Sequence, residues 1–124
     1  MSKRLVSIGV VVAVAAASSS AMAHGDAKPT HGGIVQTAND LSFELVMQAD
    51  GAVIYIVDHE KPVAVAGVTG KLTVLNGADK SEAELKPAGD RLEAKGVRLA
   101  SGSKVVAFAT MADEKTVSLR FAIK

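Results

Sequence analysis

Apolar and polar residues alternate early in the chain, and this alternation is its clearest structural signal. Every second position of one run is apolar, at Leu41, Phe43, Leu45 and Met47, with Ser42, Glu44, Val46 and Gln48 between them. A period of two predicts a strand with one buried face, which would place Met47 inward and Glu44 outward. The turn signal Asp50-Gly51 and a second run rich in β-branched residues follow. We therefore predict a β-hairpin over residues 41–57 that nucleates the fold.

Similar patterns predict strands along the rest of the chain, and no window shows helical periodicity. The expected strands are 34–36, 63–65, 71–75, 81–86, 91–95, 105–110 and 117–123. Turn signals recur about every 8–12 residues, which is typical of all-β sandwiches and small barrels. The charged segments 81–86 and 91–95 are expected at sheet edges, and the apolar segment 105–110 in the centre. The predicted fold is a small antiparallel β-sandwich or barrel of about seven to nine strands.

Residues 1–23 have the organisation of a secretory signal peptide. A basic start at Lys3 and Arg4 precedes an apolar run over 5–17, and the segment ends on a small-x-small cleavage site at Ala23. The alternative, an N-terminal membrane anchor, is disfavoured because the apolar run is too short to span a bilayer comfortably. No cysteine follows the cleavage site, so we expect no lipid anchor of the bacterial lipoprotein type. We expect export to the periplasm and no membrane association after cleavage.

Cleavage changes the charge and length on which further inference depends. Removing residues 1–23 from 124 leaves 101 residues, and it removes two basic residues and no acidic one, so the net charge changes from +1 to −1. This balance gives no indication of nucleic-acid binding. The chain contains no cysteine, so a core of Val, Leu, Ile and Ala must provide the stability. We expect a flexible histidine-containing lead-in over 24–33 and a single β-domain over 34–124.

Sequence signals of catalysis are lacking. The chain has no cysteine, no Gly-x-Ser-x-Gly motif and no serine placed near a histidine in a recognisable frame. No glycine-rich phosphate loop precedes a helix, because no helix is predicted. We therefore expect that the protein is not an enzyme.

The three histidines, His24, His31 and His59, are the candidate metal ligands. Signal cleavage would make His24 the N-terminus, where its α-amine and Nδ1 form a chelate that suits Cu(II), the ion with the highest affinity for nitrogen sites. His31 lies seven residues further on and can close over the same ion. His59 stands between Asp58 and Glu60, and this triplet can add a nitrogen or a carboxylate oxygen.

Each histidine also has a purely structural interpretation. His24 follows a cleavage site at which many residues are tolerated, and His31 precedes two glycines and suits a turn. His59 suits a solvated turn whose exit Pro62 fixes. The spacing of the histidines matches no established metal signature. Metal binding and incidental histidines are therefore both open interpretations of these residues.

Four segments of the chain resemble a small periplasmic β-domain of proteobacteria. They are His31-Gly32-Gly33, 43–46, 54–63 and 70–74. This domain occurs as short exported proteins and, in similar form, near the N-terminus of some heavy-metal efflux adaptor subunits. The resemblance covers residues 30–75 and singles out His31 and His59 as positions that the domain tends to carry. The chain lacks the helical hairpin and lipoyl-like segments of the adaptors, so the resemblance implies a stand-alone metal-binding or accessory protein.

These observations lead to two hypotheses of different kinds. The first is a periplasmic metal-binding or metal-homeostasis accessory protein, with copper as the first candidate ion and zinc as the second. Its expected ligands are His24, His31, His59 and Asp58, and its candidate partner is a metal-efflux adaptor protein. The alternative is a metal-independent β-domain for protein interaction in the cell envelope.

Overall fold

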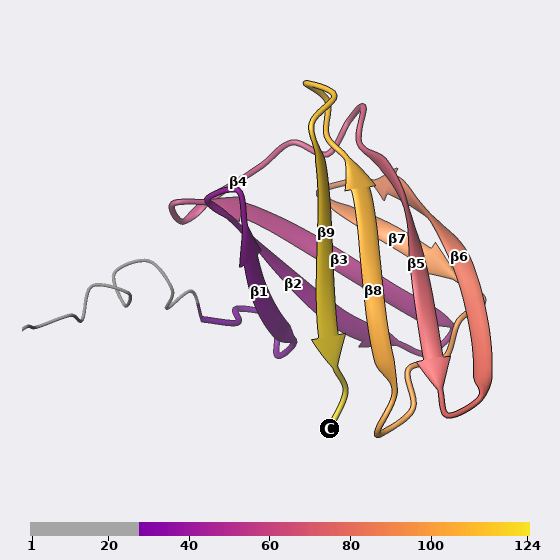
Figure 1. The fold of residues 1–124 in the computed structure, drawn as a ribbon. Helices are drawn as coiled ribbons and strands as arrows, with labels where there is room; N and C mark the ends of the chain where they lie inside the picture. Colours follow the sequence, from indigo (N-terminus) through magenta and orange to yellow (C-terminus); the bar gives the residue numbers. More distant parts are fainter. Residues whose placement is uncertain (1–27) are drawn as a thin grey trace, which may run out of the picture.

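The computed structural model describes residues 28–124, and every regular element in this part of the chain is a β-strand. The nine strands are β1 (Ile34–Ala38), β2 (Leu41–Gln48), β3 (Gly51–Asp58), β4 (Lys61–Pro62), β5 (Thr69–Asn76), β6 (Asp79–Ala88), β7 (Arg91–Lys95), β8 (Lys104–Thr110) and β9 (Thr116–Ala122). They form an antiparallel, barrel-like sheet (Figure 1), which confirms the predicted fold class. Within this range no helix could cross a membrane. The predicted signal peptide lies outside the described residues.

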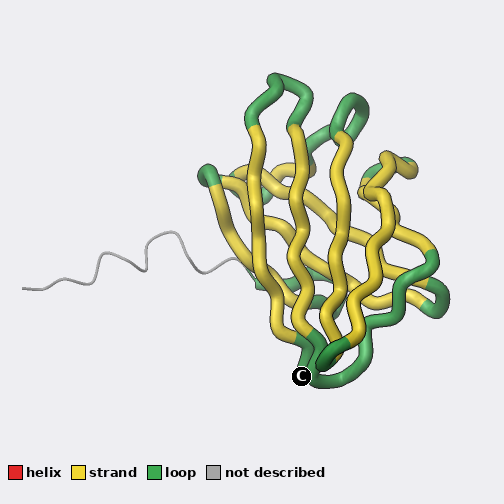
Figure 2. The backbone as a smooth tube through the Cα atoms, turned by 45° about the vertical axis from the view of Figure 1, so that its right-hand side comes forward, coloured by secondary structure: helices red, strands yellow, loops and turns green. Residues whose placement is uncertain are grey.

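The order of the strands shows how the sheet curls into a nearly closed barrel. Hydrogen-bonded neighbours follow the order β1-β2-β3-β7-β6-β5-β8-β9, with β4 also paired to β3. The long strand β6 joins the two halves, because its first part pairs with β5 and its last three residues pair with β7. The terminal strands of this order, β1 and β9, lie close together without pairing. Figure 2 shows the strands wrapped around one interior.

The β2–β3 hairpin forms as the alternating pattern predicts. Its register runs from Ser42 opposite Val57 to Gln48 opposite Gly51. Gly51 lies so close to β7 that a Cβ atom at this position would collide with the carbonyl oxygen of Ala94. The Asp-Gly turn signal therefore serves both the hairpin and the contact of β3 with the neighbouring strand.

The barrel interior is filled by apolar side chains, mostly aliphatic, from both halves of the sheet. The largest fully buried side chains include Phe43, Phe121, Leu45, Ile54, Ile56, Leu72, Leu85 and Leu92. On β9, Val117, Leu119 and Phe121 are buried in alternation with exposed residues, as predicted, and Ile123 continues the pattern just after the strand. Because these residues are contributed by strands distant in sequence, the core forms only when the whole barrel closes.

The prediction that 91–95 is an edge strand is wrong, because β7 pairs with both β6 and β3. The segment 81–86 has strands on both sides only at its end, since residues 81–85 pair with β5 alone and Lys86 begins the pairing with β7. Their charged side chains lie on the outer face, where Glu82 approaches Lys71 and Lys80 at 3.6 Å each. Alternating charge marks an exposed face, whereas an edge is defined by unpaired backbone groups that side-chain pattern does not report.

Other expected features need smaller corrections. Met47 shares the inner face with its cross-strand partner Ala52, yet it is 55% exposed because it lies at the open end of the barrel beside the loop that follows β7. The strand expected at 63–65 is a loop, since pairing with β3 ends at Pro62. The strand expected at 105–110 does lie inside the sheet, although Phe108 is exposed on its outer face.

Replacing Ile54 or Ile56 by alanine should reduce the free energy of unfolding by about 2–5 kcal/mol each. Both side chains are almost completely buried in the barrel, so truncation leaves a cavity. Met47→Ala is the matched control, because an exposed side chain should change stability by less than about 0.5 kcal/mol. Chemical denaturation measures all three variants, and equal small effects would contradict the packing described above.

Candidate functional site

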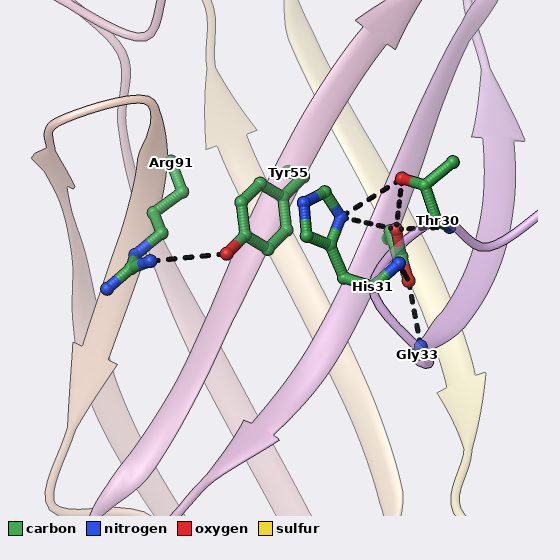
Figure 3. A network of polar contacts seen from close by, with 6 residues as sticks. Thr30, His31, Gly33, Tyr55 and Arg91 are labelled. Atoms are coloured by element: carbon green, nitrogen blue, oxygen red, sulfur yellow. Dashed lines mark hydrogen bonds and ion pairs between the residues drawn. The ribbon is translucent and has the colours of Figure 1, made fainter.

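Glu44 is a buried carboxylate on the outer face of β2, where the pattern predicts an exposed side chain. It is only 5% exposed. Its oxygens accept hydrogen bonds from the backbone N–H groups of Thr30 at 3.1 Å, His31 at 2.8 Å and Gly33 at 2.7 Å (Figure 3). These hydrogen bonds attach the end of the predicted lead-in to the sheet. They also replace the water that a buried carboxylate loses, and so offset the cost of burying its charge.

The imidazole of His31 lies between this carboxylate and an aromatic ring. Its Nδ1 atom is 3.1 Å from Oε1 of Glu44 and 3.0 Å from the hydroxyl of Thr30. Its ring stacks on Tyr55, with centroids 3.6 Å apart and an interplanar angle of 1°. Glu44 and Tyr55 are direct cross-strand neighbours in the β2–β3 hairpin, so both supports of the imidazole belong to one rigid element. The imidazole is thus held on two sides while its side chain is 41% exposed.

The ionisation of Glu44 follows from its surroundings. Burial alone would raise the pKa of Glu44, but the hydrogen bonds from the Gly33 backbone, the His31 ring and the His31 and Thr30 backbone outweigh it and lower the pKa below the ordinary value. The carboxylate is therefore charged at neutral pH. Within residues 28–124 the other ring nitrogen of His31, Nε2, takes part in no hydrogen bond.

Tyr55 connects this cluster to Arg91 on β7. Nη1 of Arg91 donates a hydrogen bond of 3.2 Å to the Tyr55 hydroxyl, and its guanidinium carbon lies 5.9 Å from the ring centroid. Nη2 of Arg91 is 3.7 Å from a carboxylate oxygen of Glu93. Val53, which pairs with Val46 of β2 and Glu93 of β7, is fully buried although it belongs to the outer face. Burial on the outer face is therefore not confined to Glu44.

His59 occupies a different environment in the tight turn between β3 and β4. Its Nδ1 atom lies 2.6 Å from Oδ1 of Asp58, and the two side chains are 83% and 53% exposed. His59 and Glu60 both have positive φ angles, of 52° and 73°. No hydrogen bond or ion pair joins this pair to His31 within the described part of the chain.

The structure therefore separates the candidate ligands that the sequence proposed together. His59 and Asp58 form one exposed pair, and His31 forms another arrangement with Glu44. His24 lies outside the described residues. Among residues 28–124, no three His, Cys, Asp or Glu side chains surround one point closely enough to hold a metal ion.

Sequence reasoning missed Glu44, Tyr55 and Arg91 as members of the site. The hairpin register, counted from the turn, would have placed Glu44 beside Tyr55. No local pattern in the sequence indicates that residues 30–33 fold back onto β2. Nor does any local pattern indicate that β7 places Arg91 beside Tyr55. Comparison with known proteins adds no further guide, since the chain matches no family model and no curated protein or solved structure matches it significantly.

Glu44→Gln should destabilise the metal-free protein at neutral pH by about 1–3 kcal/mol, because it removes charge-assisted hydrogen bonds from a buried group. In the folded state the pKa of Glu44 lies below its ordinary value of 4.5. Its contribution is therefore fully present above the unfolded-state pKa and is lost as pH falls through the folded-state pKa.

The stability difference between wild type and Glu44→Gln should accordingly shrink as pH falls from neutral through and below 4.5, the ordinary pKa of this group. Urea denaturation at several pH values measures this difference. Glu84→Gln controls for the loss of one negative charge on the outer face, because this side chain is exposed. A difference for Glu44→Gln that stays constant over this range would contradict the assigned ionisation.

Glu60→Gly should stabilise the fold by about 0.5–1 kcal/mol, because a left-handed backbone conformation strains a residue that has a Cβ atom. Glu114 has a φ angle of 72°, close to that of Glu60, so Glu114→Gly provides an independent second test. Thermal unfolding would show higher midpoints for both variants. A lower midpoint for both would mean that these two turns are not strained as the backbone angles indicate.

Proposed function

We propose that this chain is a periplasmic metal-binding or metal-homeostasis accessory protein, with copper as its first ion and zinc as its second. The observation that supports this proposal best is the environment of His31. A buried carboxylate engages Nδ1 and an aromatic face supports the ring, while Nε2 has no partner in the described residues. Histidine ligands in metal sites characteristically donate their second ring nitrogen to a carboxylate in this way.

The remaining ligands in this proposal come from the exported N-terminus. After signal cleavage His24 offers an α-amine and an imidazole, and His31 is the seventh residue after it. A segment of seven residues spans up to about 23–25 Å when extended, so His24 can return to an ion at Nε2 of His31. Three nitrogens from two residues suit Cu(II) better than other first-row divalent ions.

The His59–Asp58 pair is the auxiliary part of the proposal. Its atoms contact each other and it is highly exposed, so it is not preorganised around the same ion as His31. A metal-efflux adaptor protein is the proposed partner, because a small exported domain that binds an ion must deliver or receive it. The competing function is a metal-independent interaction domain of the cell envelope, in which the histidines bind no ion.

Tyrosine fluorescence provides a direct test, because Tyr55 is the only tyrosine and the chain contains no tryptophan. Cu(II) bound at His31 would lie close to the stacked ring of Tyr55 and should quench its emission. The protein must begin at His24, since a preceding residue would block the α-amine. Titration of this protein with Cu(II) should quench Tyr55 at one equivalent.

Variants should rank the ligands. An added residue before His24 should weaken Cu(II) binding most, His31→Ala should have an intermediate effect, and His59→Ala should have the smallest. His59→Ala is the matched control, because it removes an imidazole outside the Glu44 cluster. The reverse ranking would move the site to the turn at 58–60, and an absence of Cu(II) and Zn(II) binding in isothermal titration would favour the metal-independent function.

A further inference from the structure

We propose that Glu44 is a positioning residue that fixes the tautomer of His31, so that Nε2 is the nitrogen offered to a metal ion. This inference rests on the proposed function for its consequence, metal affinity, but the tautomer itself can be observed without a metal. It concerns a residue that would not touch the ion.

The donors around Glu44 determine which partner carries each proton. Three backbone N–H groups, of Thr30, His31 and Gly33, can only donate, and together they contact both carboxylate oxygens. A carboxylate surrounded by donors acts as an acceptor, and an ionised one has no proton to give. The proton between Glu44 and His31 therefore belongs to Nδ1 of the imidazole.

The threonine hydroxyl agrees with this assignment. Oγ1 of Thr30 lies 3.4 Å from Oε1 of Glu44 and 3.0 Å from Nδ1 of His31. The hydroxyl can donate its one proton to the carboxylate while its lone pairs face the Nδ1–H group. Every donor in the cluster then has an acceptor, and no two protons face each other.

A neutral imidazole with its proton on Nδ1 has its lone pair on Nε2. This is the form that binds a metal ion through Nε2, and the hydrogen bond made by the other nitrogen selects it. Stacking on Tyr55 at 3.6 Å fixes the plane of the ring, so the lone pair also has a fixed direction. Glu44 and Tyr55 thus control different properties of the same ligand, its protonation and its orientation.

Glu44→Gln should reverse the tautomer, although the backbone N–H of Thr30, which donates to Oε1 in the wild type, then loses its acceptor. Two of the three backbone donors, His31 and Gly33, contact Oε2, so the amide oxygen of the substituted side chain is expected to occupy that position. Its NH₂ group would then take the position of Oε1 and donate to Nδ1 of His31. The proton of the neutral ring would move to Nε2, which could no longer bind a metal ion without losing it.

The experiment combines a spectroscopic and a binding measurement on the protein that begins at His24. Nitrogen-15 NMR of the imidazoles at a pH where His31 is neutral should show the Nδ1–H form in wild type and the Nε2–H form in Glu44→Gln. Thr30→Ala keeps the carboxylate and should keep the wild-type tautomer. Identical ring-nitrogen shifts in wild type and Glu44→Gln would overturn the inference.

Copper affinity tests the consequence. Glu44→Gln should weaken Cu(II) binding by about 10- to 100-fold, the usual effect of removing a group that orients a metal-bound histidine. In the His31→Ala background the same substitution should have no further effect, because Glu44 acts through His31. Glu84→Gln removes one negative charge from an exposed residue whose described ion pair is with Lys86, and it should bind as wild type does.

The two proposals can fail separately. A wild-type protein that shows the predicted tautomer but binds no metal would refute the proposed function and leave the positioning role of Glu44 intact. A wild-type protein that binds Cu(II) while Glu44→Gln binds it equally well would refute the positioning role alone. An equal loss from Glu44→Gln in the presence and absence of His31 would assign Glu44 a purely structural role.

Discussion

The arrangement of residues 30–33 on the outer face of the barrel depends on the carboxylate of Glu44. Without donors its burial would be strongly unfavourable, and the donors come from residues that precede the first strand. The requirement to satisfy one buried charge therefore orders Thr30, His31 and Gly33 against the barrel. Gly33 meets a second constraint there, because a Cβ atom at this position would collide with the carbonyl oxygen of Leu45.

The β2–β3 hairpin provides the frame on which this interaction is built. Its inner face carries Phe43, Leu45, Ile54 and Ile56, which belong to the core. Its outer face carries Glu44 beside Tyr55, fixed by the same register. A slip of one residue would exchange the two faces, so the core that stabilises the barrel also guarantees the geometry of the candidate site. Stability and site are in this sense specified by the same pairing.

A small β-domain without disulfides has limited means to hold an imidazole precisely, and here two of the contacts of His31 restrain different motions of the ring. A hydrogen bond to a carboxylate restrains rotation of the ring, and stacking on Tyr55 restrains its tilt. Arg91 in turn holds the Tyr55 hydroxyl from the neighbouring strand. By contrast, His59 has one contact, with the adjacent Asp58, and its side chain is largely exposed. The two imidazoles are chemically alike, and they differ in how firmly the surrounding residues fix the ring.

The sequence alone determined the fold class, the hairpin and most of the inner face, because each depends on local alternation and on turn residues such as Asp50-Gly51. It also identified His31 and His59 as the histidines to consider in the described part of the chain. Only the tertiary structure decided which strands are edges, since pairing partners such as β3 and β7 are distant in sequence and charge marks only the exposed face. It likewise decided that Glu44 is buried, because the donors that make this burial possible lie outside the strand whose alternation predicts an exposed residue. The candidate site is a contact between a lead-in without periodicity and the outer face of a sheet, and a contact of that kind has no local signature in the sequence.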